Sequence, residues 1–396
     1  MISFGSELSD LRERLEYDER VLGSIERVYG EELVIVLRSL LTPPQRLYLR
    51  VNTLRISRED VIRILREEGV EAYPDPYIEE AVYLKVHGPN KIRDSGLRVF
   101  VDKRAAESIM MGANLYSPGV IRCDPGIKRG SIVSIYSENM ILLAEGEAQI
   151  SCEEALDQRR GLFVKTLKSL YKAPSVRDLS VWRHGYVYPQ SLPSMIASRL
   201  LEPRENEIII DMCAAPGGKT SHIFELSGGR ARVVAFDHSR KRVEEMIANL
   251  ERLGYREGIE IRVGDSRYIS VDYPGLVADK IMLDPPCTAT GVRPKIYDKK
   301  NEKELLSLVR YQEQFLREAH KILRKNGLLV YSTCSITYDE NEALINKILG
   351  EKLFEPIEPP DYIKRISYTG TDGVGIRFHP HKNDSPGHYM ILLKKI

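Results

Sequence analysis

Residues 207–220 form the stretch Glu207-Ile208-Ile209-Ile210-Asp211-Met212-Cys213-Ala214-Ala215-Pro216-Gly217-Gly218-Lys219-Thr220. Its apolar first half is typical of a buried strand. A helix can begin at Lys219, where the first N–H groups are free to bind a ligand. Gly217 and Gly218 let the backbone approach that ligand closely. Three classes of nucleotide-binding protein use such a turn, so the stretch predicts a nucleotide-like cofactor without naming it.

Two aspartates and one missing glycine narrow the choice of cofactor. A P-loop needs a glycine where this chain has Cys213. Asp237 ends the next predicted strand, about 20 residues beyond the glycines, where a carboxylate can accept hydrogen bonds from ribose hydroxyls. Asp265 ends the third strand and can accept from the exocyclic amine of adenine; alternatively, either aspartate only caps the next helix. Since the turn also lacks the Gly-x-Gly-x-x-Gly spacing, S-adenosylmethionine fits better than NAD.

Strand and helix patterns alternate regularly after Ser180. The predicted strands are 207–212, 232–237, 259–265, 279–284 and 328–332, and the predicted helices are 239–253, 303–323 and 339–349. Such alternation predicts an α/β fold with a mostly parallel sheet, helices on both faces, and a ligand at the carboxyl ends of the strands. The apolar run at 389–393 predicts a last, antiparallel strand.

Two cysteines follow neighbouring predicted strands, in Asp284-Pro285-Pro286-Cys287 and Ser332-Thr333-Cys334-Ser335. Both thiols can therefore face one pocket beside the cofactor, although a buried cysteine is more often a small apolar residue. A thiolate that adds to carbon 6 of a pyrimidine makes carbon 5 nucleophilic enough to accept a methyl group. Asp284 can protonate ring nitrogen 3, and Lys219 can lower a thiol pKa or stabilise charge. This chemistry leaves either cysteine as the nucleophile and requires an unpaired or extruded base.

Charge and cysteine counts limit the function classes. The 396 residues include 58 Lys and Arg against 57 Asp and Glu, so the chain lacks an overall positive field and any RNA contact must come from local patches. The five cysteines show no Cys-x-x-Cys pair and no even framework, which predicts no disulfide framework and a reducing, cytoplasmic setting. We expect no membrane segment, because no apolar run approaches about 18 residues.

The first 171 residues divide into two smaller units. A strand pattern at 47–54, a helix start at Ser57-Arg58-Glu59-Asp60 and a strand pattern at 81–86 predict a small α/β scaffold. From Leu97 on, short strands alternate with glycine turns and predict a compact β-barrel. The order of its pieces resembles a PUA domain, which binds RNA. Those pieces are Asp102, Ala105-Ala106, Gly112-Ala113, Pro118-Gly119-Val120 and Lys128-Arg129-Gly130.

Three motifs in order resemble the NSUN (Fmu/Sun-type) RNA cytosine-carbon-5 methyltransferases. The motifs are the cofactor loop 213–219, Asp284-Pro285-Pro286-Cys287 and Thr333-Cys334-Ser335, and Arg50-Val51-Asn52-Thr53-Leu54 resembles the N-terminal element of that family. The resemblance implies a Rossmann-like class I S-adenosylmethionine methyltransferase domain with a small N-terminal α/β (RRM-like) domain and an inserted PUA β-barrel. We place these domains at 176–396, 1–96 and 97–175.

The resemblance also implies roles for single residues. Cys334 would be the nucleophile, Cys287 would assist product release, and Asp284 and Lys219 would complete the catalytic pocket. The cofactor residues it implies are Cys213, Ala214, Ala215, Pro216, Gly217, Gly218, Lys219, Asp237, Arg242, Asp265 and Asp284.

The inserted PUA barrel narrows the resemblance to the branch of human NSUN member six. Members of that branch methylate tRNA near the 3′ end of the acceptor stem, and the PUA domain would bind the single-stranded CCA end. We expect a monomeric tRNA (cytosine-5-)-methyltransferase. Two alternatives remain open: the same chemistry on rRNA, and a non-catalytic RNA-binding protein.

The C-terminal half has two further features, a departure from the family pattern near its end and a basic stretch after Cys287. The family pattern keeps Arg377-Phe378-His379-Pro380 here, but Gly387-His388-Tyr389 replaces a Gly-Phe-Phe run. His379 and His381 lack Cys or acidic partners at ligand spacing, so we expect no metal. The basic residues that follow the Pro-Pro-Cys turn predict either RNA phosphate contacts or a solvated helix start. They are Arg293, Lys295, Lys299, Lys300 and Lys303.

Overall fold

The largest sheet has five parallel strands, in the order β13-β12-β11-β14-β15. The computed structural model describes residues 4–255 and 257–396. The parallel strands are β11 (Ile208–Asp211), β12 (Arg232–Asp237), β13 (Ile259–Val263), β14 (Ala278–Leu283) and β15 (Leu323–Thr333). All five predicted strands are confirmed, and their carboxyl ends lie at one edge of the sheet.

Four further strands extend this sheet beyond β15. They are β16 (Phe354–Ile357), β17 (Tyr368–Thr369), β18 (Ile376–Phe378) and β19 (His388–Lys395). The last of these, β19, runs antiparallel to β15, with Ser332 opposite Met390. The prediction of a closing antiparallel strand is therefore confirmed.

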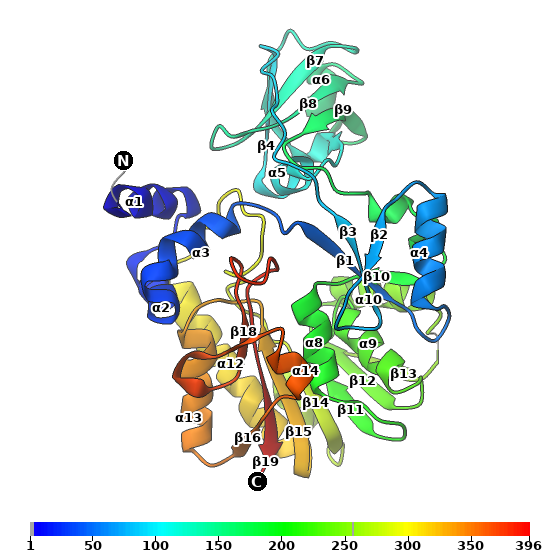
Figure 1. Cartoon of the computed structure of the whole chain (residues 1–396), viewed down its shortest axis with the longest axis vertical. Helices are drawn as coiled ribbons and strands as arrows, with labels where there is room; N and C mark the ends of the chain where they lie inside the picture. Colours follow the sequence, from blue (N-terminus) through cyan, green and yellow to red (C-terminus); the bar gives the residue numbers. More distant parts are fainter. Residues whose placement is uncertain (1–3, 256) are drawn as a thin grey trace.

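Helices cover both faces of the large sheet (Figure 1). One face packs against α8 (Leu192–Leu200), α9 (Gly218–Leu226) and α10 (Arg240–Leu253), and the other against α12 (Glu302–Ile322) and α13 (Leu344–Gly350). Successive strand residues point to opposite faces: Ile209 belongs to the first core and Ile210 to the second. Two short helices, α11 (Ile269–Asp272) and α14 (Asp361–Lys364), lie in the loops.

The N-terminal segment serves two different parts of the molecule. Helices α1 (Phe4–Leu15), α2 (Glu19–Tyr29) and α3 (Leu33–Leu40) share an apolar core with Leu305 of α12 and with Ile336. In Figure 1 these helices (dark blue) lie beside α12, away from the strands that follow them in sequence. The apolar stripe of these helices therefore packs on the methyltransferase fold and not on the sheet that follows them in sequence.

A four-stranded antiparallel sheet, in the order β10-β1-β3-β2, follows these helices. Its elements are β1 (Arg46–Val51), β2 (Ala72–Pro74), β3 (Ala81–Lys85), β10 (Val187–Pro189) and the covering helix α4 (Arg58–Glu67). Ser57 caps α4 by accepting a hydrogen bond from the Asp60 N–H at 3.1 Å, as the helix-start pattern predicted. Strand β10 returns across the predicted limit at residue 176 and completes this first sheet next to a short helix, α7 (Ser180–Arg183).

The predicted PUA barrel is a six-stranded sheet in the order β5-β9-β8-β7-β4-β6, packed around an apolar core that also includes Ile296 from the methyltransferase unit. Its elements are β4 (Arg98–Val101), α5 (Lys103–Met110), β5 (Leu115–Tyr116), β6 (Val120–Cys123), β7 (Ile132–Ser137), β8 (Leu142–Ala148), α6 (Cys152–Gln158) and β9 (Leu162–Ser169). In Figure 1 this unit (cyan to green) stands above the first sheet and the large sheet.

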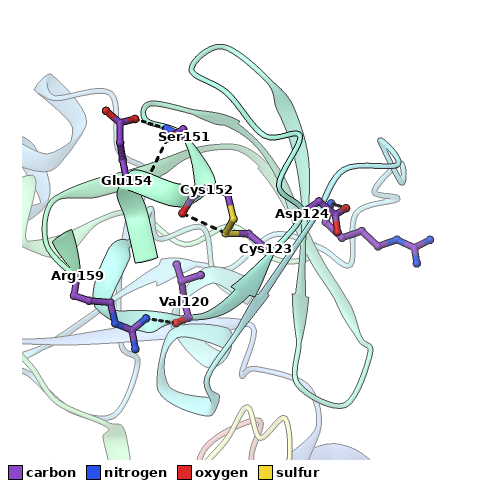
Figure 2. The surroundings of a disulfide bond; sticks show 8 residues. Val120, Cys123, Asp124, Ser151, Cys152, Glu154 and Arg159 are labelled. Carbon is purple, nitrogen blue, oxygen red and sulfur yellow. Dashed lines mark hydrogen bonds between the residues drawn. A yellow bond between two sulfur atoms is a disulfide. The ribbon is translucent and has the colours of Figure 1, made fainter. Parts of the chain in front are cut away.

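One prediction about the cysteines is wrong: Cys123 and Cys152 form a disulfide (Figure 2). Cys123 ends β6, and Cys152 is the first residue of α6, where Ser151 and Glu154 form a reciprocal capping box. The two cysteines are 29 residues apart, and only the closure of the barrel brings β6 and the start of α6 together. Counting cysteines along the sequence could not show this contact.

Candidate active site

The glycine turn forms the N-terminus of α9 and borders a cavity. Gly217 has a φ of 98°, in the left-handed region, and a Cβ there would lie 2.9 Å from the Met246 side chain. A Cβ on Gly218 would lie 2.9 Å from the ring of Tyr188. The turn therefore needs both glycines. The residues Cys213–Pro216, Gly218 and Lys219 line a cavity of about 230 Å³ together with Tyr188–Ser191, Ser194 and Asp284.

Asp237 and Arg242 lie on the other side of Cys213. The Asp237 carboxylate is buried; it accepts hydrogen bonds from the Ser239 N–H at 3.0 Å and the Ala215 N–H at 3.3 Å. The Arg242 guanidinium lies 3.3 Å from the same carboxylate and also donates to the Ala215 carbonyl. Asp237 and Arg242 thus border one hollow with Asp265, Tyr311 and the adjoining residues Met212, Cys213, His238, Gly264, Ser266, Pro286 and Phe315.

Asp265 has the capping role that the sequence left open, and it also lines this hollow. Its side chain accepts from the Arg267 N–H at 3.1 Å and pairs with the Arg267 guanidinium at 2.5 Å. Hydrogen bonds from Arg267 lower the pKa of Asp265. An ionised Asp265 at the rim of the hollow can still accept a hydrogen bond from an amine, so capping and ligand binding do not exclude each other here.

The two cysteines after β14 and β15 meet at the edge of the sheet. Their Sγ atoms lie 3.4 Å apart. Leu283 pairs with Tyr331 in the parallel ladder, so each strand delivers its cysteine to the same place only a few residues later. The two thiols therefore lie together as expected, but neither is among the residues that line the cavity at the glycine turn, so a shared pocket stays a prediction.

An ion pair joins the cofactor loop to the same edge. Lys219 Nζ donates to Asp284 Oδ2 at 2.5 Å, and the Ser332 hydroxyl donates to Asp284 Oδ1 at 3.0 Å. Burial disfavours both charges, but the pair outweighs it, since the pKa of Lys219 is raised and the pKa of Asp284 is lowered. Asp284 is therefore ionised in the free protein, and Lys219 carries the proton of the pair.

The two thiols have opposite acidities. A hydrogen bond from Cys287 lowers the pKa of Cys334, and the nearby Lys219 ammonium lowers it further. The same contact raises the pKa of Cys287, which keeps its proton as the donor. Cys334 is thus the thiol that forms a thiolate first, which is the form that attacks carbon.

Several residues at the site had no role in the sequence-based prediction. Arg50 of the first sheet is fully buried and donates to the Gly218 carbonyl. Gln190 lines the cavity at the glycine turn. Glu340 is fully buried behind the two cysteines and contacts both of their loops. The signal for Glu340 was the run of four polar residues 339–342 at the start of a predicted helix, and the burial of its last three residues could not be read from the sequence.

Arg293 and Lys295 do not form a solvated helix start, because their side chains are only 5% and 4% exposed and bind the Thr42 carbonyl and Asp298. His379 lies 3.2 Å from the Tyr29 hydroxyl. Within the described part of the chain, no group of three or more His, Cys, Asp or Glu side chains is placed to hold a metal. The described residues also contain no helix with the length and apolarity to cross a membrane.

Three family models match the chain. They are the 16S rRNA methyltransferase RsmB/F at residues 198–394, the PUA domain at 97–170, and the ferredoxin-like domain of RsmF/B-like methyltransferases at 21–90. The last match agrees with the small α/β sheet around β1.

The relatives match over nearly the whole chain. The tRNA (cytosine(72)-C(5))-methyltransferase of Pyrococcus horikoshii is 38% identical over 97% of both chains. Human tRNA (cytosine(72)-C(5))-methyltransferase NSUN6 is 28% identical over 86% of this chain and 79% of its own. The crystal structure of NSun6 from Pyrococcus horikoshii with SFG superimposes with a TM-score of 0.88 at 37% identity, over 96% of this chain and 99% of that one. The chain belongs to the S-adenosylmethionine-dependent RNA cytosine-carbon-5 methyltransferases, in the PUA-containing branch that includes NSUN6.

Proposed function

We propose that this protein methylates carbon 5 of a cytosine in tRNA, near the 3′ end of the acceptor stem, where the relatives named above modify position 72. The observation that carries the proposal is the pair of thiols, 3.4 Å apart, beside the Lys219–Asp284 ion pair at the end of the cofactor loop. Pyrimidine methylation at carbon 5 needs a nucleophile for carbon 6 and groups that move protons, and the second thiol can assist release of the nucleophile.

The residues present fit S-adenosylmethionine. The turn at Gly217 and Gly218, where a Cβ would meet the side chains of Met246 and Tyr188, brings the backbone to the cavity next to a helix N-terminus. We assign the glycine loop 213–219 to the amino-acid part of the cofactor, Asp237 with Arg242 to the ribose, and Asp265 to the base. When bound, the cofactor supplies an electrophilic methyl group.

Cys334 acts as the nucleophile in this proposal. Its thiolate forms a bond to carbon 6 of the cytosine, and the electron pair of the carbon 5–carbon 6 double bond becomes available at carbon 5. After carbon 5 has gained the methyl group, a water molecule acting as base takes the carbon-5 proton, the electron pair of that bond restores the carbon 5–carbon 6 double bond, and Cys334 leaves carbon 6 as a thiolate. Cys287, the protonated partner at 3.4 Å, assists that last step as the thiolate leaves.

Lys219 and Asp284 supply the proton that ring nitrogen 3 gains and take it back at the end of the reaction. The free protein holds that proton on Lys219, hydrogen-bonded to Asp284. A base that enters the cavity excludes water from this pair and weakens the charge separation, so the proton can pass through Asp284 to the ring nitrogen. The proton returns when the adduct collapses.

A second cavity, of about 330 Å³, supports a path for single-stranded RNA from the PUA unit to the site. It is lined by Met111 of the PUA unit, Tyr48 of the first sheet, and Arg293 and Pro386 of the methyltransferase unit. The two cavities share the segment 189–191, so the second adjoins the cavity at the glycine turn. A tRNA whose CCA end binds the PUA unit can place an acceptor-stem cytosine near the thiols along this path.

We divide the chain into three domains. We assign residues 1–96, 97–175 and 176–396 to the scaffold, PUA and methyltransferase domains, and we expect a monomer that works in the cytoplasm. The match of residues 198–394 to a 16S rRNA methyltransferase model makes rRNA the second candidate substrate. The PUA unit and the full-length tRNA-modifying relatives favour tRNA.

The test uses tRNA and 16S rRNA transcripts with labelled S-adenosylmethionine, followed by bisulfite sequencing of the product. We expect label only in tRNA, at one acceptor-stem cytosine. Cys334→Ala should abolish both methylation and the denaturant-resistant protein–RNA adduct, whereas Cys287→Ala should let that adduct accumulate. Label in rRNA alone would overturn the substrate, and turnover by Cys334→Ala would overturn the mechanism.

A further inference from the structure

The buried carboxylate of Glu340 is bound directly to the loop that carries Cys287. Glu340 lies in the π-helical turn Asp339–Ala343 and is fully buried. Its Oε1 accepts from the Thr288 N–H at 2.8 Å, and its Oε2 accepts from the Thr288 hydroxyl at 2.6 Å. Thr288 is the residue after Cys287, so these two bonds fix the position of that cysteine's backbone.

The same carboxylate holds the loop that carries Cys334. Oε2 of Glu340 accepts from the Ser335 hydroxyl at 2.5 Å and the Thr337 hydroxyl at 2.9 Å. Ser335 is the residue after Cys334. Gln312 of α12 completes the set, since its Nε2 donates both to Glu340 Oε1 and to the Pro286 carbonyl, each at 2.9 Å.

A carboxylate suits this place and an amide does not. Five donors converge on its two oxygens, whereas a glutamine has one acceptor oxygen and would direct an N–H₂ at some of these donors. The two cysteine loops belong to different strands, so no local hydrogen bond within either loop sets the 3.4 Å contact between the thiols. Glu340 bridges the residues that directly follow both cysteines.

The charge of Glu340 works against thiol ionisation. The main influence on the pKa of each thiol is their mutual hydrogen bond, which lowers the pKa of Cys334 and raises the pKa of Cys287. Glu340 raises the pKa of both. A buried negative charge near a nucleophilic thiol is therefore an electrostatic disadvantage, and a benefit of position must offset it.

We propose that Glu340 is a positioning residue that holds Cys334 and Cys287 in contact, so that attack by one and release by the other stay coupled. The proposal rests on the proposed function for its consequence in catalysis. Its structural part, the thiol contact, is measured without RNA.

The first experiment follows alkylation of Cys334 by iodoacetamide against pH, read by peptide mass spectrometry, in the wild type and in Glu340→Gln. If Glu340 holds the pair, the variant loses the Cys287 hydrogen bond, and the pKa of Cys334 rises. If Glu340 acts only through its charge, its removal lowers that pKa. An upward shift supports the proposal, and a downward shift or no shift overturns it, whether or not the protein methylates RNA.

The second experiment separates the two loops. Thr288→Val removes one hydroxyl on the Cys287 side, and Ser335→Ala removes one on the Cys334 side. We expect a severalfold higher ratio of adduct to methylated RNA for Thr288→Val, and severalfold slower adduct formation for Ser335→Ala. The matched control is Glu342→Gln, in the same turn, because Glu342 is equally buried but binds Arg377. Adduct ratios equal to those of Glu342→Gln in both variants would overturn the proposal.

Discussion

Replacing Arg50 with methionine should weaken both the fold and the cofactor loop. Arg50 is fully buried, and its Nη2 donates to Glu225 Oε1 at 2.9 Å and to the Ser221 hydroxyl at 2.7 Å. Its Nη1 donates to the Gly218 carbonyl in the glycine turn. The arginine lies in β1 of the first sheet, and its partners lie in α9, so one side chain joins the scaffold to the cofactor site.

The magnitude follows from the burial of both charges. The side chains of Arg50 and Glu225 are 0% and 2% exposed. Removal of one partner from a buried pair costs about 3–5 kcal/mol, because the other charge stays buried without a counter-ion. Burial already raises the pKa of Glu225, and Arg50 opposes that rise. The variant should therefore bind a proton on Glu225 near neutral pH and lose less stability at pH 5 than at pH 8.

The assay is urea unfolding at pH 8 and pH 5, with cofactor binding followed by calorimetry. Arg50→Met combined with Glu225→Leu should recover most of the lost stability, because Tyr255 still donates to Asn52 at 2.6 Å when Glu225 is gone. Cofactor affinity should stay reduced in both variants, since the Gly218 carbonyl has lost its donor. Arg55→Met, which changes an exposed arginine near the same element, is the control. A double variant no more stable than Arg50→Met would refute the reasoning.

Three further predictions follow from the disulfide, one histidine and the thiol pair. Cys123→Ser should lower the stability of the PUA unit by about 3–4 kcal/mol, because the bond to Cys152 closes a loop over 29 residues; hydrogen exchange should then increase in that unit alone. Burial lowers the pKa of His379 to about 3, so its neutral form stabilises the fold and that stability is lost as pH falls below about 6.5; urea midpoints should drop more between pH 7 and pH 5 in the wild type than in His379→Phe. Iodoacetamide should alkylate Cys334 at lower pH than Cys287, and Cys287→Ala should raise the pKa of Cys334; the reverse order would contradict the hydrogen bond between them.

The features that the sequence predicted well depend on short-range patterns. The strands of the large sheet are continuous apolar runs, and a parallel sheet brings their carboxyl ends to one edge. The meeting of Cys287 with Cys334 and of Lys219 with Asp284 follows from that rule, because each residue directly follows a strand or begins the helix after one. Such residues need no knowledge of side-chain packing to be placed.

The features that the sequence did not predict depend on contacts between units. Strand β10 pairs with β1 across the whole PUA insertion, and Cys123 meets Cys152 only once the barrel closes. Arg50 was part of a family-like motif, but its burial against α9 requires the two domains to be docked. The sequence placed Arg293 and Lys295 in a basic stretch that could contact RNA phosphates or begin a solvated helix. In the fold both side chains are buried and pair with aspartates, because charge alone does not predict exposure.

The scaffold domain supports the active site, because its residue Arg50 binds the glycine turn of the cofactor loop. Spacing alone left Cys287 and Cys334 as equal candidates for the nucleophile, since both follow a strand in a turn. The contact between the two thiols makes their acidities unequal: it lowers the pKa of Cys334, which the Lys219 ammonium lowers further, and it raises the pKa of Cys287. Lys219 in turn begins its helix beside Gly218, whose carbonyl is held by Arg50 from the first sheet. A contact from the first sheet thus holds the turn from which Lys219 extends to the Asp284 carboxylate beside the two thiols.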